Sequence, residues 1–201
     1  MKGLSTYKSY YPLPLRKTLL FGVLLMGLLV NSATTSAQNN NENWSAVIEG
    51  SLTFGGNMSR NTLVYRTGPY ITASLVKTLY PQLQWGGGFG LLAFQKESFI
   101  PVFTNFRLWI NPNPKGFYFE MKAGWSLGTN PAVEQISGNT YRGGLFVQPT
   151  FGYRIPIHTF STQFGLQLVS QQARHQFKNS EIQYTEFISF HTLGIFFGIE
   201  F

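Results

Sequence analysis

The feature that most constrains the fold is an alternation of apolar with small or polar residues that recurs from residue 44 to the C-terminus. The last ten residues show it best, because Leu193, Ile195 and Phe197 share one face while Thr192 and Gly194 lie on the other. Period-two alternation is typical of strands with one apolar face, and segments of about 10–13 residues suit tilted membrane-spanning strands. We predict eight strands, at residues 44–54, 69–79, 83–94, 100–110, 117–128, 144–155, 161–172 and 192–201.

The connections between these segments differ in length. The short ones lie at residues 80–82, 111–116 and 158–160, and the longer polar ones at 55–61, 129–143 and 173–186, with the short segment 95–98 as an exception. Outer-membrane barrels have short periplasmic turns and longer outer loops, and an even strand number places both termini at the periplasmic side. The predicted fold is therefore an all-β, eight-stranded antiparallel up-and-down barrel over residues 44–201. Pro149 lies inside the sixth strand, where we expect a bulge.

Alternation alone fits both a soluble barrel with its apolar face inside and a membrane barrel with its apolar face outside. The polar face here consists of Gly, Ser, Thr and Gln with few charges; the chain has no Asp, and charged residues make up only 11% of it. Soluble surfaces carry about 25–35% charged residues. Since monomers rarely expose large apolar patches to water, we expect the apolar face to point into a bilayer. The sequence thus predicts a transmembrane β-barrel.

The N-terminal region predicts export. A leader with four basic residues and no acidic one precedes an apolar run at 18–30, and small polar residues follow up to Ala37. This order is typical of a cleaved secretory signal, and the run is shorter than the roughly 20 residues of a membrane-spanning helix. We predict a signal peptide at 1–37, Sec-type export and a periplasmic tether at 38–43. Since four of the 15 Lys and Arg lie in the leader, the net charge of +7 is no evidence for nucleic-acid binding.

Six charged residues have the parity of the barrel interior, three of each sign. In the hairpin at 111–116, pairing Ile110 with Phe117 places Arg107 opposite Glu120. Buried ions are costly unless they are paired, so we predict an Arg107–Glu120 salt bridge, with Lys122 close enough to join it. The predicted interior charge network comprises Glu49, Arg107, Glu120, Lys122, Arg154 and Glu200.

Aromatic residues occupy two kinds of position. Several lie near the periplasmic strand ends, where an interfacial girdle is expected, although aromatic residues favour strands in any case. Bulky inward-pointing residues predict a filled interior, because an eight-stranded barrel is just wide enough for side chains. The girdle positions are Trp44, Tyr80, Phe117, Tyr153 and Phe201, and the inward ones are Phe103, Trp109, Phe146 and Phe196.

The segments 100–107, 144–154 and 192–201 resemble small outer-membrane β-barrel proteins of the Bacteroidota type, grouped as porin-family or barrel-domain proteins. The similarity covers most of the mature chain and rests on barrel signatures, so it implies fold and bacterial outer-membrane location. The terminal Phe201 looks like the aromatic C-terminal residue that the barrel-assembly machinery recognises. The resemblance implies no catalytic site.

The sequence contains only weak motifs for catalysis or for the binding of nucleotides or metals. Gly86-Gly87-Gly88-Phe89-Gly90 fails the dinucleotide pattern because Leu91 stands where it needs glycine, so glycines bending the barrel wall explain it better. Cysteine is absent, the three histidines match no zinc spacing, and we predict neither metal nor cofactor. Ser189 and His191 share the outward face, as in outer-membrane lipid A deacylases, but in reversed order and without a placed acid.

We therefore predict a non-enzymatic outer-membrane barrel with a structural or surface-interaction role. The loops 129–143 and 173–186 are the expected contact surfaces. A lipid A deacylase-like enzyme, with Ser189 and His191 as catalytic residues, and a narrow-pore porin remain alternatives. The expected partners are outer-membrane lipid and lipopolysaccharide, the barrel-assembly machinery, and an unidentified extracellular or periplasmic partner, with no role for nucleic acid.

Overall fold

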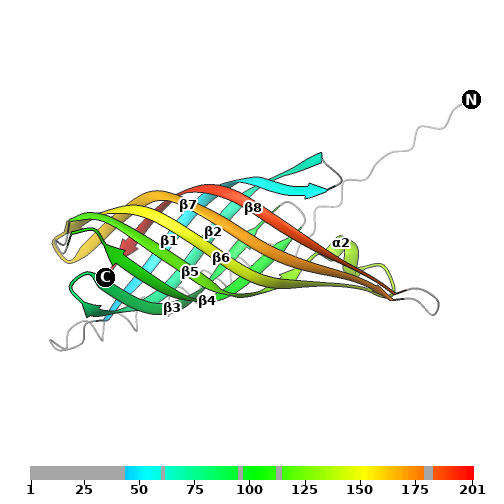
Figure 1. The fold of residues 1–201 in the computed structure, drawn as a ribbon, viewed down its shortest axis with the longest axis horizontal. Coiled ribbons are helices and arrows are strands. Elements are labelled where there is room, and N and C mark those ends of the chain that lie inside the picture. Colours follow the sequence, from blue (N-terminus) through cyan, green and yellow to red (C-terminus); the bar gives the residue numbers. More distant parts are fainter. Residues whose placement is uncertain (1–43, 60–61, 95–96, 112–114, 179–182) are drawn as a thin grey trace, which may run out of the picture. The chain divides into compact units, whose positions relative to one another are not determined.

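The computed structural model describes residues 44–59, 62–94, 97–111, 115–178 and 183–201. The predicted signal peptide and tether lie outside these residues. Within them, eight antiparallel strands pair in sequence order into a closed barrel (Figure 1). The strands are β1 (Trp44–Ser59), β2 (Thr62–Tyr80), β3 (Leu83–Ala93), β4 (Ser98–Trp109), β5 (Gly116–Thr129), β6 (Asn139–Ile157), β7 (Phe160–Lys178) and β8 (Gln183–Glu200).

The first and last strands close the barrel. β1 pairs with β8 from Val47 opposite Glu200 to Asn57 opposite Phe190. The backbone of Ala46 adds a reciprocal pair of hydrogen bonds with Phe201, of 3.2 and 2.9 Å. Since every strand then has a neighbour on both sides, no sheet edge remains, which is the arrangement that a bilayer without water requires. The predicted fold class is confirmed.

The alternation read from the sequence separates the two faces of the wall. Along β8, Leu193, Ile195 and Phe197 are exposed on the outer surface, whereas Thr192 and Phe196 are buried inside the barrel. The remaining strands carry the same outward apolar face. Because burial follows the period of two, the apolar residues cover the outside and the polar residues share the inside with aromatic rings.

The strands continue well beyond the predicted ends on the side opposite the C-terminus. β7 runs to Lys178 and β8 begins at Gln183, so most of the predicted loop 173–186 is strand. The predicted loop 129–143 contains a short helix, α2 (Pro131–Glu134), and the start of β6. In these extensions polar residues are mixed with aromatic ones such as Tyr184 and Phe187, and β7 and β8 stay paired in an antiparallel ladder up to Lys178 opposite Gln183. The prediction of a longer connection is therefore wrong at 173–186 and also at 55–61, since β1 runs to Ser59 and β2 begins at Thr62. Between β5 and β6 a longer connection remains, but it is shortened to residues 130–138.

Pro149 does not form the predicted bulge. Its register with Met121 on β5 is regular, and the β6–β7 register is the same on both sides of it. The irregularity of β6 lies between Gly143 and Phe146 instead. Outside that irregularity, the β6–β7 pairing omits only the positions of Gln148 and Pro149, and the proline has no backbone N–H to donate.

The glycine cluster of β3 brings neighbouring strands close together. A Cβ atom at Gly86 would lie 2.0 Å from the carbonyl oxygen of Leu75 and 2.9 Å from Oδ1 of Asn105. At Gly88 it would lie 2.3 Å from the carbonyl oxygen of Ala73. These glycines therefore belong to the tightly curved wall, in agreement with their interpretation from the sequence.

None of the helical residues that the structure describes forms a helix long and apolar enough to cross a membrane.

Candidate functional site

Two groups of side chains at different heights occupy much of the barrel interior, beside a smaller cluster of Trp109, Tyr118 and Phe196 and several buried glutamines. We call the first the charge layer, and it lies toward the short turns. We call the second the aromatic layer, and it lies toward the strand extensions. The charge layer consists of Glu49, Arg107, Glu120, Lys122, Arg154 and Glu200, and the aromatic layer of Tyr70, Leu92, Phe94, Phe99, Phe103, Tyr141, Phe146, Val169, Ala173 and Phe190.

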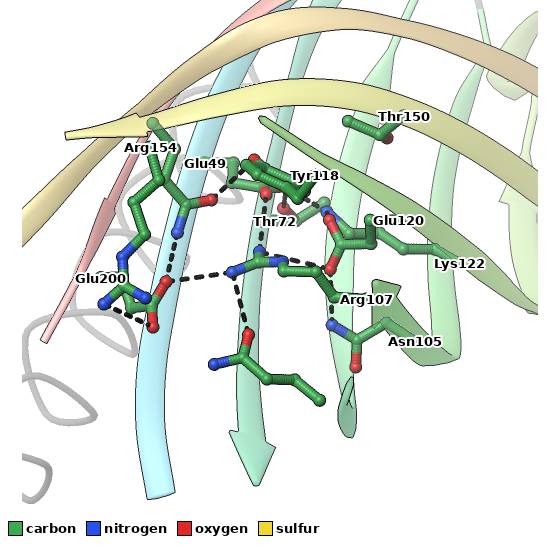
Figure 2. A network of polar contacts seen from close by, with 12 residues as sticks. Glu49, Thr72, Asn105, Arg107, Tyr118, Glu120, Lys122, Thr150, Arg154 and Glu200 are labelled. Carbon is green, nitrogen blue, oxygen red and sulfur yellow. Dashed lines mark hydrogen bonds and ion pairs between the residues drawn. The ribbon is translucent and has the colours of Figure 1, made fainter. Parts of the chain in front are cut away.

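Five strands supply the charge layer. Glu49 comes from β1, Arg107 from β4, Glu120 and Lys122 from β5, and the remaining two from β6 and β8. The structure places all six side chains inside the barrel. β4 and β5 pair in the register that sets Arg107 directly opposite Glu120. Residues far apart in the sequence thus meet because the barrel closes around them (Figure 2).

Arg107 lies at the centre of the charge layer. Its Nη2 atom is 3.4 Å from Oε1 of Glu120 and 3.9 Å from Oε1 of Glu49, and its Nη1 atom is 3.0 Å from Oε2 of Glu200. The guanidinium also lies over the ring of Tyr118, at 4.5 Å from the centroid. With no exposed surface, this one cation contacts all three interior carboxylates (Figure 2). It therefore holds three strands of the wall to β4.

Lys122 completes the pairing of the carboxylates on its side. Its ammonium group contacts Glu49 and lies 3.6 Å from Oε2 of Glu120. The hydroxyl of Thr72 donates to Glu49 at 2.9 Å, and Nδ2 of Asn105 donates to Glu120 at 2.8 Å. Each carboxylate thus has both a cation and a neutral donor, which offsets the cost of removing it from water.

Glu200 joins the charge layer to the last residues of the chain. It accepts hydrogen bonds from Arg107 and from Nε2 of Gln163, and its Oε1 atom lies 3.2 Å from Nη2 of Arg154. The hydroxyl of Tyr118 donates to Gln163 at 2.8 Å. Arg154 is the only one of the six charged side chains with substantial exposure, at 20%. Arg154 is therefore the member of the layer that is accessible to solvent.

The aromatic layer closes the other end. Phe99 is fully buried and its ring packs against Phe94, Tyr141 and Phe190, with centroids 5.5–6.2 Å apart. Val133 of α2 packs on this layer. The two layers meet where Nζ of Lys122 lies 5.6 Å from the ring centroid of Phe103. Charged and aromatic side chains therefore lie in contact inside the barrel.

Sequence reasoning missed an ion pair of the strand extensions. Nε of Arg66 lies 3.4 Å from Oε2 of Glu97, which is buried. Glu97 falls in a segment predicted as a turn, and Arg66 precedes the predicted second strand. Glu97 does lie in the connection between β3 and β4, and Arg66 lies in the part of β2 that precedes the predicted strand, so strand alternation gave no signal for this pair.

The residues of the weaker site predictions lie on the outer surface. Ser189 and His191 are on the outward face of β8, opposite Gln172 and Ser170 of β7. Among the described residues, no hydrogen bond joins Ser189 to His191 and no carboxylate pairs with His191. Likewise no group of three His, Cys, Asp or Glu suited to a metal ion is found among them. Ser189 and His191 are thus accessible at the surface, but they lack the hydrogen bonds that link the residues of a catalytic triad.

Aromatic residues at the short-turn end point outward. Trp44, Tyr80 and Phe117 are exposed, and Nζ of Lys77 lies 5.5 Å from the Trp44 ring centroid. The ring of Phe117 stands edge-on to Tyr153, with centroids 4.7 Å apart. These positions suit the interface between hydrocarbon and headgroups, where an amphipathic ring and a long cationic side chain are both accommodated.

Comparison with solved structures identifies the architecture. The outer membrane protein AlkL, determined in lipid bilayers, is similar with a TM-score of 0.55 and 10% identity over 81% of this chain and 90% of that one. The fold is that of a small outer-membrane β-barrel. Neisserial surface protein A (TM-score 0.46, 8% identity, 79% and 96% covered) and OprG from Pseudomonas aeruginosa (0.46, 8%, 80% and 97%) are also similar. No protein-family model and no curated protein matches the sequence.

Proposed function

We propose that the mature chain is an integral protein of the bacterial outer membrane with a structural or surface-interaction role. The observation that carries this proposal is the closed wall whose outward face is apolar around all eight strands. A surface of this kind is stable in hydrocarbon and unstable in water. The resemblance to Bacteroidota barrel-domain proteins is part of the same proposal.

Export and assembly complete the proposal. A signal peptide at 1–37 directs Sec-type export, and Phe201 serves as the recognition residue for the barrel-assembly machinery. Phe201 is 40% exposed and is held by the backbone of Ala46, so its ring is available at the end of the last strand. Replacing Phe201 with Ser is then expected to lower the amount of assembled barrel without changing the packing of the interior.

The filled interior favours a structural or contact role over a pore. The charge layer and the aromatic layer both lie across the lumen, and Arg107, Lys122, Phe99 and Phe146 are fully buried. An eight-stranded barrel has no spare width beyond such side chains. Planar-bilayer recording of the purified protein is expected to give no stable conductance steps, and large steps would support the porin alternative.

The surface available for contacts is formed by the extended strands and α2. β6, β7 and β8 each exceed the length needed to span the hydrocarbon, and their extensions carry polar side chains such as Gln172, Gln176 and Gln183. We propose that an unidentified extracellular partner binds to these strand extensions. Deleting the gene and screening for envelope phenotypes tests for such a role.

A lipid-modifying enzyme is the alternative from another class, since Ser189 and His191 are outward-facing near the upper end of the apolar surface. Lipid A profiles of cells expressing the wild type and Ser189→Ala distinguish the two proposals. Identical profiles are expected; deacylated lipid A that disappears with the variant would favour the enzyme.

Cell fractionation tests the location. The protein is expected with the outer-membrane fraction and is expected to migrate faster on gels when unheated, because a closed barrel resists detergent. Recovery from the soluble periplasm, or identical mobility with and without heating, would contradict the proposal.

A further inference from the structure

Two arginines face each other on the outer wall. Arg142 of β6 is in register with Arg174 of β7, and both side chains are exposed. Their chain neighbours Tyr141 and Ala173 are buried inside, so both arginines point outward. Like charges directly opposite one another in an antiparallel pair repel. The arrangement therefore costs stability unless an anion lies between the two guanidinium groups.

The chain does not supply that anion among its described residues. Neither arginine takes part in any of the ion pairs found there. The guanidinium of Arg174 instead lies over the ring of Phe187, 5.7 Å from its centroid, and Phe187 is 75% exposed. A cation–π contact of this kind holds the guanidinium of Arg174 beside an exposed ring without using up its hydrogen-bond donors.

The position of the pair indicates where the anion comes from. The outward apolar residue Leu145 lies three positions after Arg142 on β6, and Leu168 lies six positions before Arg174 on β7. The polar residues Gln172, Ser189 and His191 share the outward face between the apolar surface and the arginines. The pair thus stands above the hydrocarbon, at the height of lipid headgroups.

We propose that Arg142 and Arg174 bind the phosphate of a phosphorylated glycolipid in the outer leaflet. The guanidinium fork matches phosphate oxygens and gives charge-assisted hydrogen bonds, while acyl chains of the same lipid lie against Leu145 and Leu168. This lipid meets both surfaces at once, which free phosphate and an acidic protein do not. The inference rests on the proposed outer-membrane location and adds a defined lipid contact to it.

The test measures retained lipid by native mass spectrometry on protein purified from outer membranes of cells expressing the full chain. The protein is incubated with diphosphorylated lipid A or with the same lipid freed of phosphate. The test variant carries both Arg142→Gln and Arg174→Gln. The control variant carries Lys77→Gln and Lys115→Gln, which remove two positive charges at the short-turn end. Heat-modifiable gel mobility first establishes that each variant forms the barrel.

The wild type and the lysine variant are expected to retain the phosphorylated lipid, and the arginine variant about tenfold less, as two charge-assisted contacts are lost. Retention of the phosphate-free lipid should be equal in all three proteins. Equal retention of phosphorylated lipid by the arginine variant would overturn the proposal. So would displacement of the lipid from the wild type by millimolar inorganic phosphate, or selective loss of an acidic protein from the arginine variant. Failure of the wild type to enter the membrane would instead overturn the proposed location.

Discussion

The two ends of the barrel interior solve the same packing problem with different interactions. In the charge layer, six ions from five strands neutralise one another in directional contacts around Arg107. In the aromatic layer, rings such as Phe99 and Phe190 fill the same width by non-directional contact. The same eight strands form the wall at both heights. The fold therefore requires side chains that fill the lumen, but at each height these can be either paired ions or packed aromatic rings.

The two layers should respond differently to substitution. Removing one ion leaves its former partners charged and buried without a counter-ion. The loss of unfolding free energy therefore includes a contribution from each group that the removed ion contacted. Removing a ring leaves a cavity whose cost depends on how far the neighbours relax. Four experiments test this contrast.

The largest effect is expected for Arg107→Met, which keeps most of the side-chain volume but removes the charge. Glu49, Glu120 and Glu200 then share one nearby buried cation, Lys122, and the partly exposed Arg154. The free energy of unfolding, measured by urea titration of the chain refolded in vesicles, should fall by about 3–5 kcal/mol. Wild-type stability for this variant would show that the charge layer does not hold the strands together.

A smaller but still large loss is expected for Phe99→Ala in the aromatic layer. Phe99 is fully buried, so the truncation leaves a cavity and should lower the unfolding free energy by about 3 kcal/mol. Phe187→Ala is the matched control, since that ring is 75% exposed and its removal should change stability by less than about 0.5 kcal/mol. Equal losses for the two rings would mean that the aromatic layer is not packed.

Coupling energies sharpen the comparison further. In a double-mutant cycle, Lys122→Met and Glu49→Gln should couple by about 1–3 kcal/mol because the two groups are in contact. Arg107→Met and Phe99→Leu should couple by less than about 0.5 kcal/mol, because eight positions along β4 separate them by about 27 Å. Strong coupling of this second pair would show that the two layers act as one unit.

The smallest effect is expected for Arg154→Gln. This arginine belongs to the charge layer but is 20% exposed, and it contacts only Glu200 among the carboxylates. Water and salt screen such a pair, so the loss should be about 1 kcal/mol or less and should shrink as the salt concentration rises. A loss as large as that of Arg107→Met would contradict the central position assigned to Arg107.

The alternation of residue types in the sequence predicted those features that depend only on which side of a strand a residue faces. It predicted eight strands, the outward faces and the inward direction of Arg107, Glu120 and Lys122, because a strand exposes alternate residues to alternate sides. It did not predict the strand extensions, since polar residues are mixed there with aromatic ones such as Tyr65, Tyr184 and Phe187 and no regular alternation is left. The contacts of Glu200 with Arg107 were also beyond it, because they depend on barrel closure and on which strands face each other across the lumen.

Spin-label scanning of β8 tests the central claim, that the apolar outer wall faces lipid, most directly. The chain has no cysteine, so single cysteines at Thr192, Leu193 and Ile195 can carry the label without further changes. In vesicles, labels at Leu193 and Ile195 should be relaxed by oxygen dissolved in the bilayer and shielded from a water-soluble nickel complex, while the label at Thr192 should be shielded from both. Access of the nickel complex to Leu193 and Ile195, or equal oxygen access at all three positions, would contradict the account.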